Sequence, residues 1–397
     1  MKSCEIHQTP LFRGAAAFAA ALAVSAAVAQ QYAITDLGTL SGPVSGAYCI
    51  NSFGHVGGSS VRSDADVNGF VWSGSLIGVP PLSGDRQSHV FDLNDAGQVV
   101  ATSYDLGESH VHGFLLQNQV AVPLGDFAPH GVNASGDVTG YVTINDASYG
   151  WVEHAARWRS GAITDLGTLG GHFSYAYAIA NDGRIVGAAA LSNEYTQHAA
   201  MWIGGAPHDL GTLGGTASQA YAMNQAGDVV GWANTAGGAP HAFLFQTDES
   251  GAVTLRRDLG DLGGGYSYAY AVNSHQQVVG TSSAKAFMWQ SGTMLNLNTA
   301  LPPSSGWILD AAWDINDAGQ IVGVGRYQGY PHAFLLSPRT CPDFDANGVV
   351  DESDLGVLLA HFGVTSGATF ADGDVDGDGA VNESDLGVLL SQWQAHC

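Results

Sequence analysis

Lysine is almost absent from this chain, and positive charge is scarce throughout. Lysine occurs only at positions 2 and 285, and the 397 residues carry a formal net charge of −24. A protein that binds nucleic acid needs cationic side chains to neutralise phosphates, and an anionic membrane surface makes the same demand. The composition therefore excludes nucleic acid as a partner and disfavours membranes, which leaves calcium and neutral glycans as partners to consider.

Long apolar runs are also missing, except at the N-terminus. After residue 29 no segment has the roughly 20 consecutive apolar residues that a membrane-spanning helix needs. The N-terminus has Lys2 and Arg13, an alanine-rich run from Gly14 to Val28, and the small-x-small tripeptide Ala27-Val28-Ala29. This order predicts a bacterial-type export signal, residues 1–29, with cleavage after Ala29 and a secreted product. The alternative for this run is a buried core helix.

Cysteine is rare, and removal of the signal would leave three: Cys49, Cys341 and Cys397. The last two bracket the C-terminal stretch, and in a compartment that permits disulfides they would join its ends. Cys49 is then left over. It is either a small buried residue in a strand or one half of an intermolecular link.

Familiar catalytic motifs are absent too. The sequence has no Gly-x-Ser-x-Gly elbow, no phosphate-binding loop and no Cys/His cluster with zinc spacing. No catalytic residue is therefore assigned.

What the chain does contain is a doubled acidic unit at its C-terminal end, whose copies begin at Asp343 and Asp374. Each copy places oxygen-bearing side chains at positions 1, 3, 5, 9 and 12 of a 12-residue loop, with glycine at position 6 and a backbone carbonyl at position 7. The predicted ligands are Asp343, Asp345, Asn347, Val349, Asp351 and Asp354 in the first loop, and Asp374, Asp376, Asp378, Ala380, Asn382 and Asp385 in the second.

This ligand order is that of an EF-hand, so the sequence predicts two bound calcium ions. Position 12 is Asp in both loops, and its shorter side chain predicts an affinity in the extracellular range of about 10⁻⁴ to 10⁻³ M. The alternative is a solvated or disordered acidic surface. Two loops with matching ligand positions argue against that alternative.

A helix is predicted after each loop, because leucines recur with helical spacing. The two sets are Leu355, Leu358, Leu359 and Phe362, and Leu386, Leu389, Leu390 and Trp393. Each set forms one apolar stripe. We expect the two stripes to bury each other and to give two packed loop–helix units.

Residues 341–397 resemble a dockerin domain, in the variant that is flanked by two cysteines. The resemblance implies a calcium-dependent module that binds a cohesin-like protein or a cell-surface component. Dockerins use a Ser-Thr pair at loop positions 10 and 11 for recognition, whereas this chain has Glu352-Ser353 and Glu383-Ser384 there. These four residues are the ones that the resemblance assigns to partner binding.

The middle of the chain is periodic, with three recurring signatures. The first is an aliphatic residue, usually followed by Asn, then Gly and a Val-rich strand; the copies are about 39 to 49 residues apart and lie at Ile50, Leu93, Val132, Ile179, Met223, Val272 and Ile315. The second is a His-Ala-Phe tripeptide or a variant of it, at His112, His154, His198, His241 and His332, with Asn68 and Lys285 in the two remaining places. The third is Asp-Leu-Gly-Thr-Leu, clearest at Asp36, Asp165 and Asp209.

Each repeat contains four short strand candidates separated by turn residues, and a repeat of this length with four strands is typical of a propeller blade. Seven copies predict a seven-bladed β-propeller over residues 30–340, in a mainly β protein. The repeats begin at Tyr32 with the fourth strand of a blade and end at Leu336 with the third. The N-terminal strand is therefore expected to complete the last blade and to cover an open edge. A β-solenoid or a sandwich is the alternative.

The repeats resemble the extracellular HAF-repeat family, named for its His-Ala-Phe tripeptide. The resemblance implies secretion. From their repetition alone, we expect each of the histidines, and the Asp of the third signature, to bond within its own blade rather than to share a metal.

A catalytic site should break the repeat, because chemistry needs unlike groups that converge. Asp146, Glu153 and Glu194 lie in such departures, and exposed aromatic residues near them would suit sugar stacking. A solvated acidic loop is the favoured alternative. We therefore expect a secreted non-catalytic protein whose propeller presents a binding surface and whose tail, residues 341–397, attaches it through calcium. The competing hypothesis is a secreted polysaccharide-acting enzyme, a glycoside hydrolase or lyase, tethered by the same tail.

Overall fold

The computed structural model describes residues 32–105, 111–192, 196–301, 305–338, 341–345, 347, 349–368, 372–375 and 380–394. Several predictions fall outside these ranges, and they concern the export signal (1–29), Glu194, Asp376, Asp378 and Cys397. Within the described ranges, neither α-helix has the length and apolarity needed to cross a membrane.

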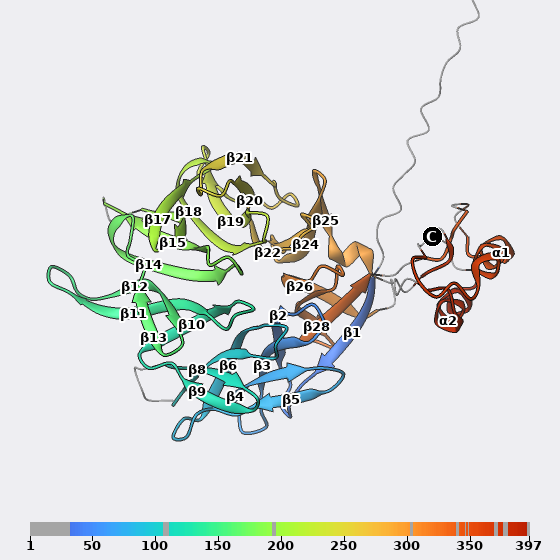
Figure 1. Ribbon diagram of the computed structural model, residues 1–397, viewed down its shortest axis with the longest axis horizontal. Helices are drawn as coiled ribbons and strands as arrows, with labels where there is room; N and C mark the ends of the chain where they lie inside the picture. Colours follow the sequence, from blue (N-terminus) through green and yellow to red (C-terminus); the bar gives the residue numbers. More distant parts are fainter. Residues whose placement is uncertain are drawn as a thin grey trace, which may run out of the picture.

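The main body is a ring of seven four-stranded antiparallel sheets, which we number as blades 1 to 7 (Figure 1). Blade 1 contains β2 (Ser45–Ile50), β3 (Val56–Val61), β4 (Val67–Trp72) and β5 (Leu76–Val79); blade 2 contains β6 (Gln87–Leu93), β7 (Val99–Tyr104), β8 (His112–Gln117) and β9 (Val120–Pro123); blade 3 contains β10 (Phe127–Val132), β11 (Val138–Asp146), β12 (Gly150–Arg159) and β13 (Ala162–Asp165).

The remaining blades have the same order. Blade 4 contains β14 (Gly170–Ile179), β15 (Ile185–Leu191), β16 (Gln197–Ile203) and β17 (Ala206–Gly211); blade 5 contains β18 (Gly214–Met223), β19 (Asp228–Thr235), β20 (Pro240–Thr247) and β21 (Val253–Asp258); blade 6 contains β22 (Ser267–Val272), β23 (Val278–Ser282), β24 (Lys285–Gln290) and β25 (Thr293–Asn296); blade 7 contains β26 (Trp307–Ile315), β27 (Ile321–Tyr327), β28 (Tyr330–Pro338) and β1 (Tyr32–Gly38). A short 3₁₀ helix, η1 (Leu297–Ala300), follows β25.

The seventh blade confirms the predicted closure of the ring. Strand β1 pairs antiparallel with β28, with Tyr32 opposite Pro338 and Asp36 opposite Phe334. The first strand of the chain is thus the outer strand of the last blade, as the phase of the repeats predicted. The seven-bladed propeller is correct, and the solenoid and sandwich alternatives are wrong.

A belt of asparagine side chains explains the first repeated signature. In blade 1, Oδ1 of Asn51 accepts hydrogen bonds from the N–H groups of Phe53 and His55, which fixes the turn after the inner strand. Its Nδ2 donates to the carbonyl of Asn94 in the next blade. The same inter-blade bond is made by Asn94, Asn133, Asn224, Asn273 and Asn316, the last of which donates to the carbonyl of Asn51 and so completes the circle.

One junction lacks this bond, because blade 4 has Ala180 where the other blades have asparagine. There the guanidinium of Arg184 donates to the carbonyl of Gln225 at 2.9 Å, and the N–H of Asn181 donates to the Gln225 side chain at 3.3 Å. The repeated asparagine is therefore a structural link between blades.

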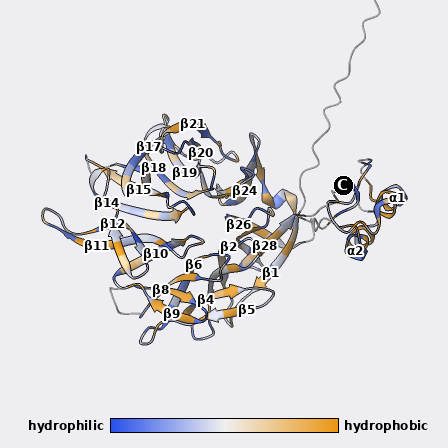
Figure 2. Ribbon diagram, viewed as in Figure 1, coloured by the Kyte–Doolittle hydropathy of each residue, from blue (hydrophilic) through white to orange (hydrophobic). Residues whose placement is uncertain are grey.

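The hydrophobic core lies between successive blades rather than in one central mass. Val322 and Leu335 of blade 7, for example, pack with Ala47, Val56 and Phe70 of blade 1. Figure 2 shows hydrophobic residues mainly along the strands and hydrophilic residues in most of the connecting loops. Each sheet thus buries both faces, which gives the short, strongly apolar strands seen in the sequence.

The tail contains two helices, α1 (Glu352–His361) and α2 (Glu383–Ser391), around a small core of its own. That core consists of Val350, Leu358, Val381 and Leu389, all fully buried. The prediction that the two leucine stripes bury each other was only partly right. Leu358 and Leu389 are buried, but Leu359, Phe362 and Leu390 are 53%, 42% and 52% exposed, because the loop valines occupy the space between the helices.

Candidate functional site

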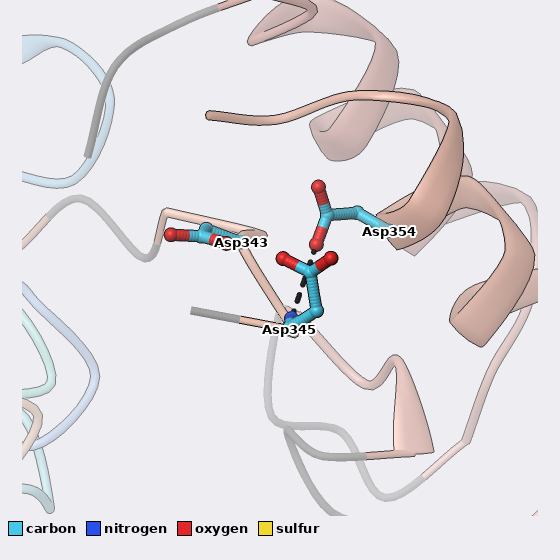
Figure 3. Close-up of side chains that lie close together, drawn as sticks. All are labelled: Asp343, Asp345 and Asp354. Carbon is cyan, nitrogen blue, oxygen red and sulfur yellow. Dashed lines mark hydrogen bonds between the residues drawn. The ribbon is translucent and has the colours of Figure 1, made fainter. Parts of the chain in front are cut away.

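The first acidic loop brings three carboxylates together. Asp343, Asp345 and Asp354 each place a carboxylate oxygen within 4.8 Å of the other two. Figure 3 shows Asp343 and Asp345 on the loop and Asp354 at the start of α1. Half of the predicted ligands of this loop therefore converge on one point.

Asp354 fastens the loop to the helix. It is fully buried, its Oδ1 accepts from the N–H of Phe344 at 2.5 Å and of Asp345 at 3.3 Å, and its Oδ2 accepts from the N–H of Asp351 at 2.9 Å. Backbone N–H donors and the N-terminus of a helix both stabilise a negative charge. The fold thus holds this carboxylate in place without a side-chain cation.

The other predicted ligands of this loop have partners within the protein. The N–H of Asn347 donates to Asp343 at 3.0 Å, and its side-chain oxygen accepts from the N–H of Val349 at 2.8 Å. Asp351 is the N-cap of α1, where its carboxylate accepts from the N–H of Ser353 at 2.8 Å. Asp351 is thus placed as a helix cap, a role that the ligand spacing did not reveal.

The second loop repeats this arrangement in the part that is described. Asp385 is fully buried and accepts from the N–H groups of Val375 at 2.7 Å and Asn382 at 2.9 Å. Asn382 caps α2 as Asp351 caps α1, and Asp374 is only 5% exposed. The two loops therefore have the same hydrogen-bonded framework.

The tail has almost no positive charge to balance these acids. No Lys or Arg follows Cys341, and His361 and His396 are its basic side chains. Buried carboxylates are costly unless a positive charge or several donors compensate them. Calcium binds carboxylate, amide and carbonyl oxygens on a flexible loop, so these residues fit a hard divalent cation.

Two further predictions concern the ends and the surface of the tail. Cys341 is disulfide-bonded, while its predicted partner Cys397 lies outside the described residues. The residues assigned to partner binding are exposed at the starts of the two helices; they are Glu352, Ser353, Glu383 and Ser384. Their position leaves them accessible to a partner.

In the propeller, four of the five repeated histidines pair with an Asp of their own blade, as predicted, whereas His112 lies 3.0 Å from Asp85 in the loop between β5 and β6. Nδ1 of His154, His198 and His241 lies about 3 Å from the carboxylates of Asp165, Asp209 and Asp258, each on the next strand of the same blade. The pair of His332 and Asp36 joins β28 to β1 at 3.0 Å. The Asp carboxylate also accepts from a nearby glycine N–H, as Asp165 does from Gly167 at 2.8 Å. These pairs fasten strands together.

The acidic residues at which the repeat is broken do not form a pair of carboxylates among the described residues. Asp146 accepts from the N–H groups of Ser148 and Tyr149 in the turn between β11 and β12, and these bonds lower its pKa. Glu153 accepts from the hydroxyl of Tyr175 at 2.5 Å. Both side chains are therefore engaged in local structure.

An aromatic collar lines the centre of the ring, and the sequence analysis missed it. Each blade contributes one side chain from its innermost strand: Tyr48, Phe91, His130, Tyr177, Tyr221, Tyr270 and Trp313. Six of the seven neighbouring pairs are in ring contact, with centroids 4.2 to 6.1 Å apart. All seven are partly exposed. The signal was present as one aromatic residue just before each copy of the first signature.

The collar depends on an irregularity at the same place in every blade. The pairing register shifts at each collar residue, for example at Tyr177 between Ala176 and Ala178, which marks a β-bulge. The bulge brings the inner strand close to its neighbour: a Cβ added at Gly187 would lie 1.9 Å from the carbonyl oxygen of Tyr175. The close approach explains the glycine of the Val-Val-Gly strand in six blades, while blade 2 has Ala101 at this place.

Three adjacent blades have a larger or polar residue directly after the collar. Blades 4, 5 and 6 have alanine there and blade 3 has Gly131, whereas blades 7, 1 and 2 have Asp314, Cys49 and Asp92. Asp314 accepts from the N–H of Ile50 at 2.8 Å, and Asp92 from that of Val132 at 2.8 Å, so each links its blade to the next.

Burial has a strong effect on the ionisation of these three side chains. It raises the pKa of Asp92 and of Asp314 to about 7. It also raises the pKa of the Cys49 thiol, with the two carboxylates adding to the shift. Cys49 is free and 3% exposed in β2, which agrees with the buried-residue interpretation rather than the intermolecular link.

No known protein family matches this chain, and no curated protein is similar to it in sequence. Among solved structures, a puromycin hydrolase is 13% identical, with 73% of this chain and 51% of that chain covered and a TM-score of 0.44. A puromycin-hydrolysing peptidase of Mycobacterium tuberculosis is 12% identical over 68% of this chain and 48% of that chain, with a TM-score of 0.42. The WD40 β-propeller domain of Doa1 is 13% identical over 77% and 97%, with a TM-score of 0.39. The chain spans about half the length of the first two, and likeness at this level does not extend to activity.

Proposed function

We propose that this protein is a secreted, non-catalytic binding protein with two working parts. The propeller presents a ligand surface, and the C-terminal tail folds around calcium and attaches the protein to a partner protein or a cell surface. The observation that carries the proposal is the convergence of Asp343, Asp345 and Asp354 within 4.8 Å, with the last of them fully buried.

Calcium would be held by the oxygens of the first loop and by their counterparts in the second. Asp343, Asp345 and Asp354 would supply carboxylates, Asn347 an amide oxygen and Val349 a backbone carbonyl, as the EF-hand order requires. The ion would supply the positive charge that the tail lacks. Because the loops contribute Val350 and Val381 to the core between the helices, ion binding and helix packing are expected to be coupled.

The attachment surface is proposed to be the exposed start of each helix, where Glu352 and Glu383 lie at equivalent positions. A calcium-ordered tail would fix both in one geometry. Since these residues are acidic, a cationic or polar partner surface is favoured over an acidic one.

The enzyme alternative receives less support from the described residues. Asp146 and Glu153, the two described acidic candidates, have their carboxylates committed to a turn and to Tyr175. A glycosidase needs two carboxyl groups that flank a bond of the substrate. Reducing-sugar release that disappears in Glu153→Gln would favour the enzyme after all.

Calorimetric titration of the full chain with calcium tests the metal part of the proposal. We expect two ions per chain with affinities of about 10⁻⁴ to 10⁻³ M. Asp343→Ala should reduce the stoichiometry to one, and Asp343→Ala combined with Asp374→Ala should abolish uptake, because the first ligand of each loop is removed.

A matched control removes the same charge without removing a ligand. Glu352→Gln lies in the same loop but is exposed and outside the carboxylate cluster, so it should still bind two ions with little change in affinity. Equal loss in Glu352→Gln and Asp343→Ala would indicate a general charge effect and would contradict the assigned site.

A further inference from the structure

A groove of about 290 Å³ opens beside the aromatic collar, where blades 7, 1 and 2 meet. Its lining includes the collar residues Tyr48 and Trp313, together with Gly46 and His89 from the inner strands. Ser59 and Val67 of blade 1 form part of its wall. It is thus a hollow next to the axis of the ring, with aromatic side chains on one side.

Small side chains explain why the hollow occurs at this place. Two residues before the collar, the inner strands of blades 4, 5 and 6 carry Tyr175, Gln219 and Tyr268, whereas blades 7 and 1 carry Ala311 and Gly46. Blade 3 also has a small residue there, Ala128, but its neighbouring blades carry His89 and Tyr175. Side chains two residues apart in a strand share a face, so these lie on the collar side. Two adjacent small residues therefore leave space that the larger ones would fill.

The collar residues at the groove have unused hydrogen-bonding groups. The hydroxyl of Tyr48, a lining residue of the groove, makes no hydrogen bond to any described residue. The indole N–H of Trp313 has no acceptor among them either, but it is buried and is not accessible from the groove. Glycine at position 46 makes room for that hydroxyl, because an added Cβ would lie 3.1 Å from it. An accessible hydroxyl without a partner beside a cavity favours a ligand that carries hydroxyl groups.

The lining residues Ser59 and His89 belong to a chain of uncharged polar groups. Nδ1 of His89 lies 3.0 Å from the hydroxyl of Ser59, and Nε2 lies 2.9 Å from the hydroxyl of Tyr104. The imidazole stacks on the Tyr104 ring with centroids 5.7 Å apart. Burial lowers the pKa of His89, so its imidazole is neutral at pH 7. The tyrosine and serine partners fix the ring in one orientation.

We propose that this groove is the ligand site of the propeller and that it binds a neutral saccharide of one or two rings. The proposal rests on the function proposed above, since it names the surface that the propeller presents. A pyranose ring has apolar C–H faces that pack on Tyr48 and Trp313, and hydroxyl groups that pair with the tyrosine hydroxyl and with the polar wall.

Charge and size both select this class of ligand. No Asp, Glu, Lys or Arg lines the groove, so neither an anion nor a cation finds a partner there, and the net charge of −24 repels anions further. Small-molecule sites usually start at about 300 Å³, which matches a small ligand. A purely apolar ligand would leave the polar groups without partners.

Binding is tested on the full chain with cellobiose, maltose and xylobiose, by saturation-transfer NMR and calorimetry, with calcium and again with chelator. We expect at least one disaccharide to bind in both conditions. Val67→Trp places a large side chain in the partly exposed wall and should weaken binding more than about tenfold, whereas Val67→Ala at the same position should change it less than about twofold.

A second variant keeps the test valid if Val67→Trp misfolds. Tyr48→Phe keeps the collar ring and removes only its hydroxyl, so it should fold normally and weaken binding by about threefold to tenfold. Trp151→Ala removes a 75% exposed tryptophan on the β11–β12 hairpin and should have no effect.

The outcomes distinguish the proposal for the groove from the proposed function of the whole protein. Binding that survives both Val67→Trp and Tyr48→Phe, or that disappears in Trp151→Ala, would place the ligand elsewhere on the propeller and overturn only the groove. Absence of binding by all three sugars would also overturn it. Failure of calcium uptake would contradict the attachment role and leave the result for the groove unchanged.

Discussion

Asp92 and Asp314 place carboxyl groups inside the ring, and their protonation is expected to affect stability. Their pKa values are raised from 3.8 to about 7 by burial. A group whose pKa is raised by folding stabilises the protein most when it is protonated. Its contribution to the free energy of unfolding is complete below about pH 4, falls as the pH rises to about 7 and is lost above that value.

The prediction is that Asp92→Ala reduces the loss of stability between pH 4 and pH 7. One unit of pKa shift corresponds to about 1.4 kcal/mol, so the stability lost over this pH range should be smaller in Asp92→Ala by a few kcal/mol at most. Chemical denaturation at several pH values measures it. Alanine occupies the equivalent place in blades 4, 5 and 6, so the fold accepts it. Equal slopes in the two proteins would contradict the assignment of Asp92.

At the scale of residues, the sequence revealed which residues repeat. It did not reveal which departures from the repeat place ionisable groups inside the ring. The closeness of Asp343, Asp345 and Asp354 could be predicted because ligand spacing is local in the sequence. Asp92, Asp314 and Cys49 were missed as a group, because they come together only when the ring closes and brings residue 314 beside residue 50. A search for positions where an acidic residue replaces a repeated alanine would have found the two carboxylates.

At the scale of single elements, the asparagine belt makes a testable link between blades. Asn273 is 3% exposed, and its Nδ2 donates to the carbonyl of Asn316 at 3.1 Å. Its Oδ1 accepts from two N–H groups of its own turn. Loss of a buried acceptor costs about 1–3 kcal/mol for each group left unsatisfied.

We therefore expect Asn273→Ala to lower the free energy of unfolding by about 1–3 kcal/mol without abolishing the fold, since blade 4 already has Ala180 at this place. The reverse change, Ala180→Asn, should raise the melting temperature or leave it unchanged. Urea unfolding followed by circular dichroism checks both. Stabilisation by Asn273→Ala would show that the belt does not hold the blades together.

The strands themselves were largely predictable. Alternating apolar residues and turn signals are local, and they identified the four strands of each blade and the strand that closes the ring. The helical stripes were less accurate, because helical spacing shows which residues share a face and not how wide the buried part is. Leu359 and Leu390 share a face with buried leucines, yet about half of each is exposed.

At the scale of the whole molecule, the propeller and the tail have separate cores. The clusters of the ring contain residues from Tyr32 to Leu336, and the cluster of the tail contains residues from Cys341 to Trp393. Two thermal transitions are therefore expected. A cation that binds only the folded tail stabilises that part alone.

Chelation should lower the transition of the tail and its helical circular dichroism while the transition of the ring stays in place. At free calcium a hundred times the dissociation constant, the effect is about 2.7 kcal/mol for each site. Asp343→Ala with Asp374→Ala should reproduce the shift without chelator. A scan in which both transitions move together, or neither moves, would contradict this division.

The pairing of β1 with β28 also sets the order of folding. Asp36 meets His332 across 296 positions of the chain, which is a very high contact order for one strand pair, and such contacts make folding slow. The first strand has no sheet to join until the last has been made. Assembly of the seventh blade is therefore expected to come last, and until it occurs the partly built ring exposes two unpaired edges to other chains.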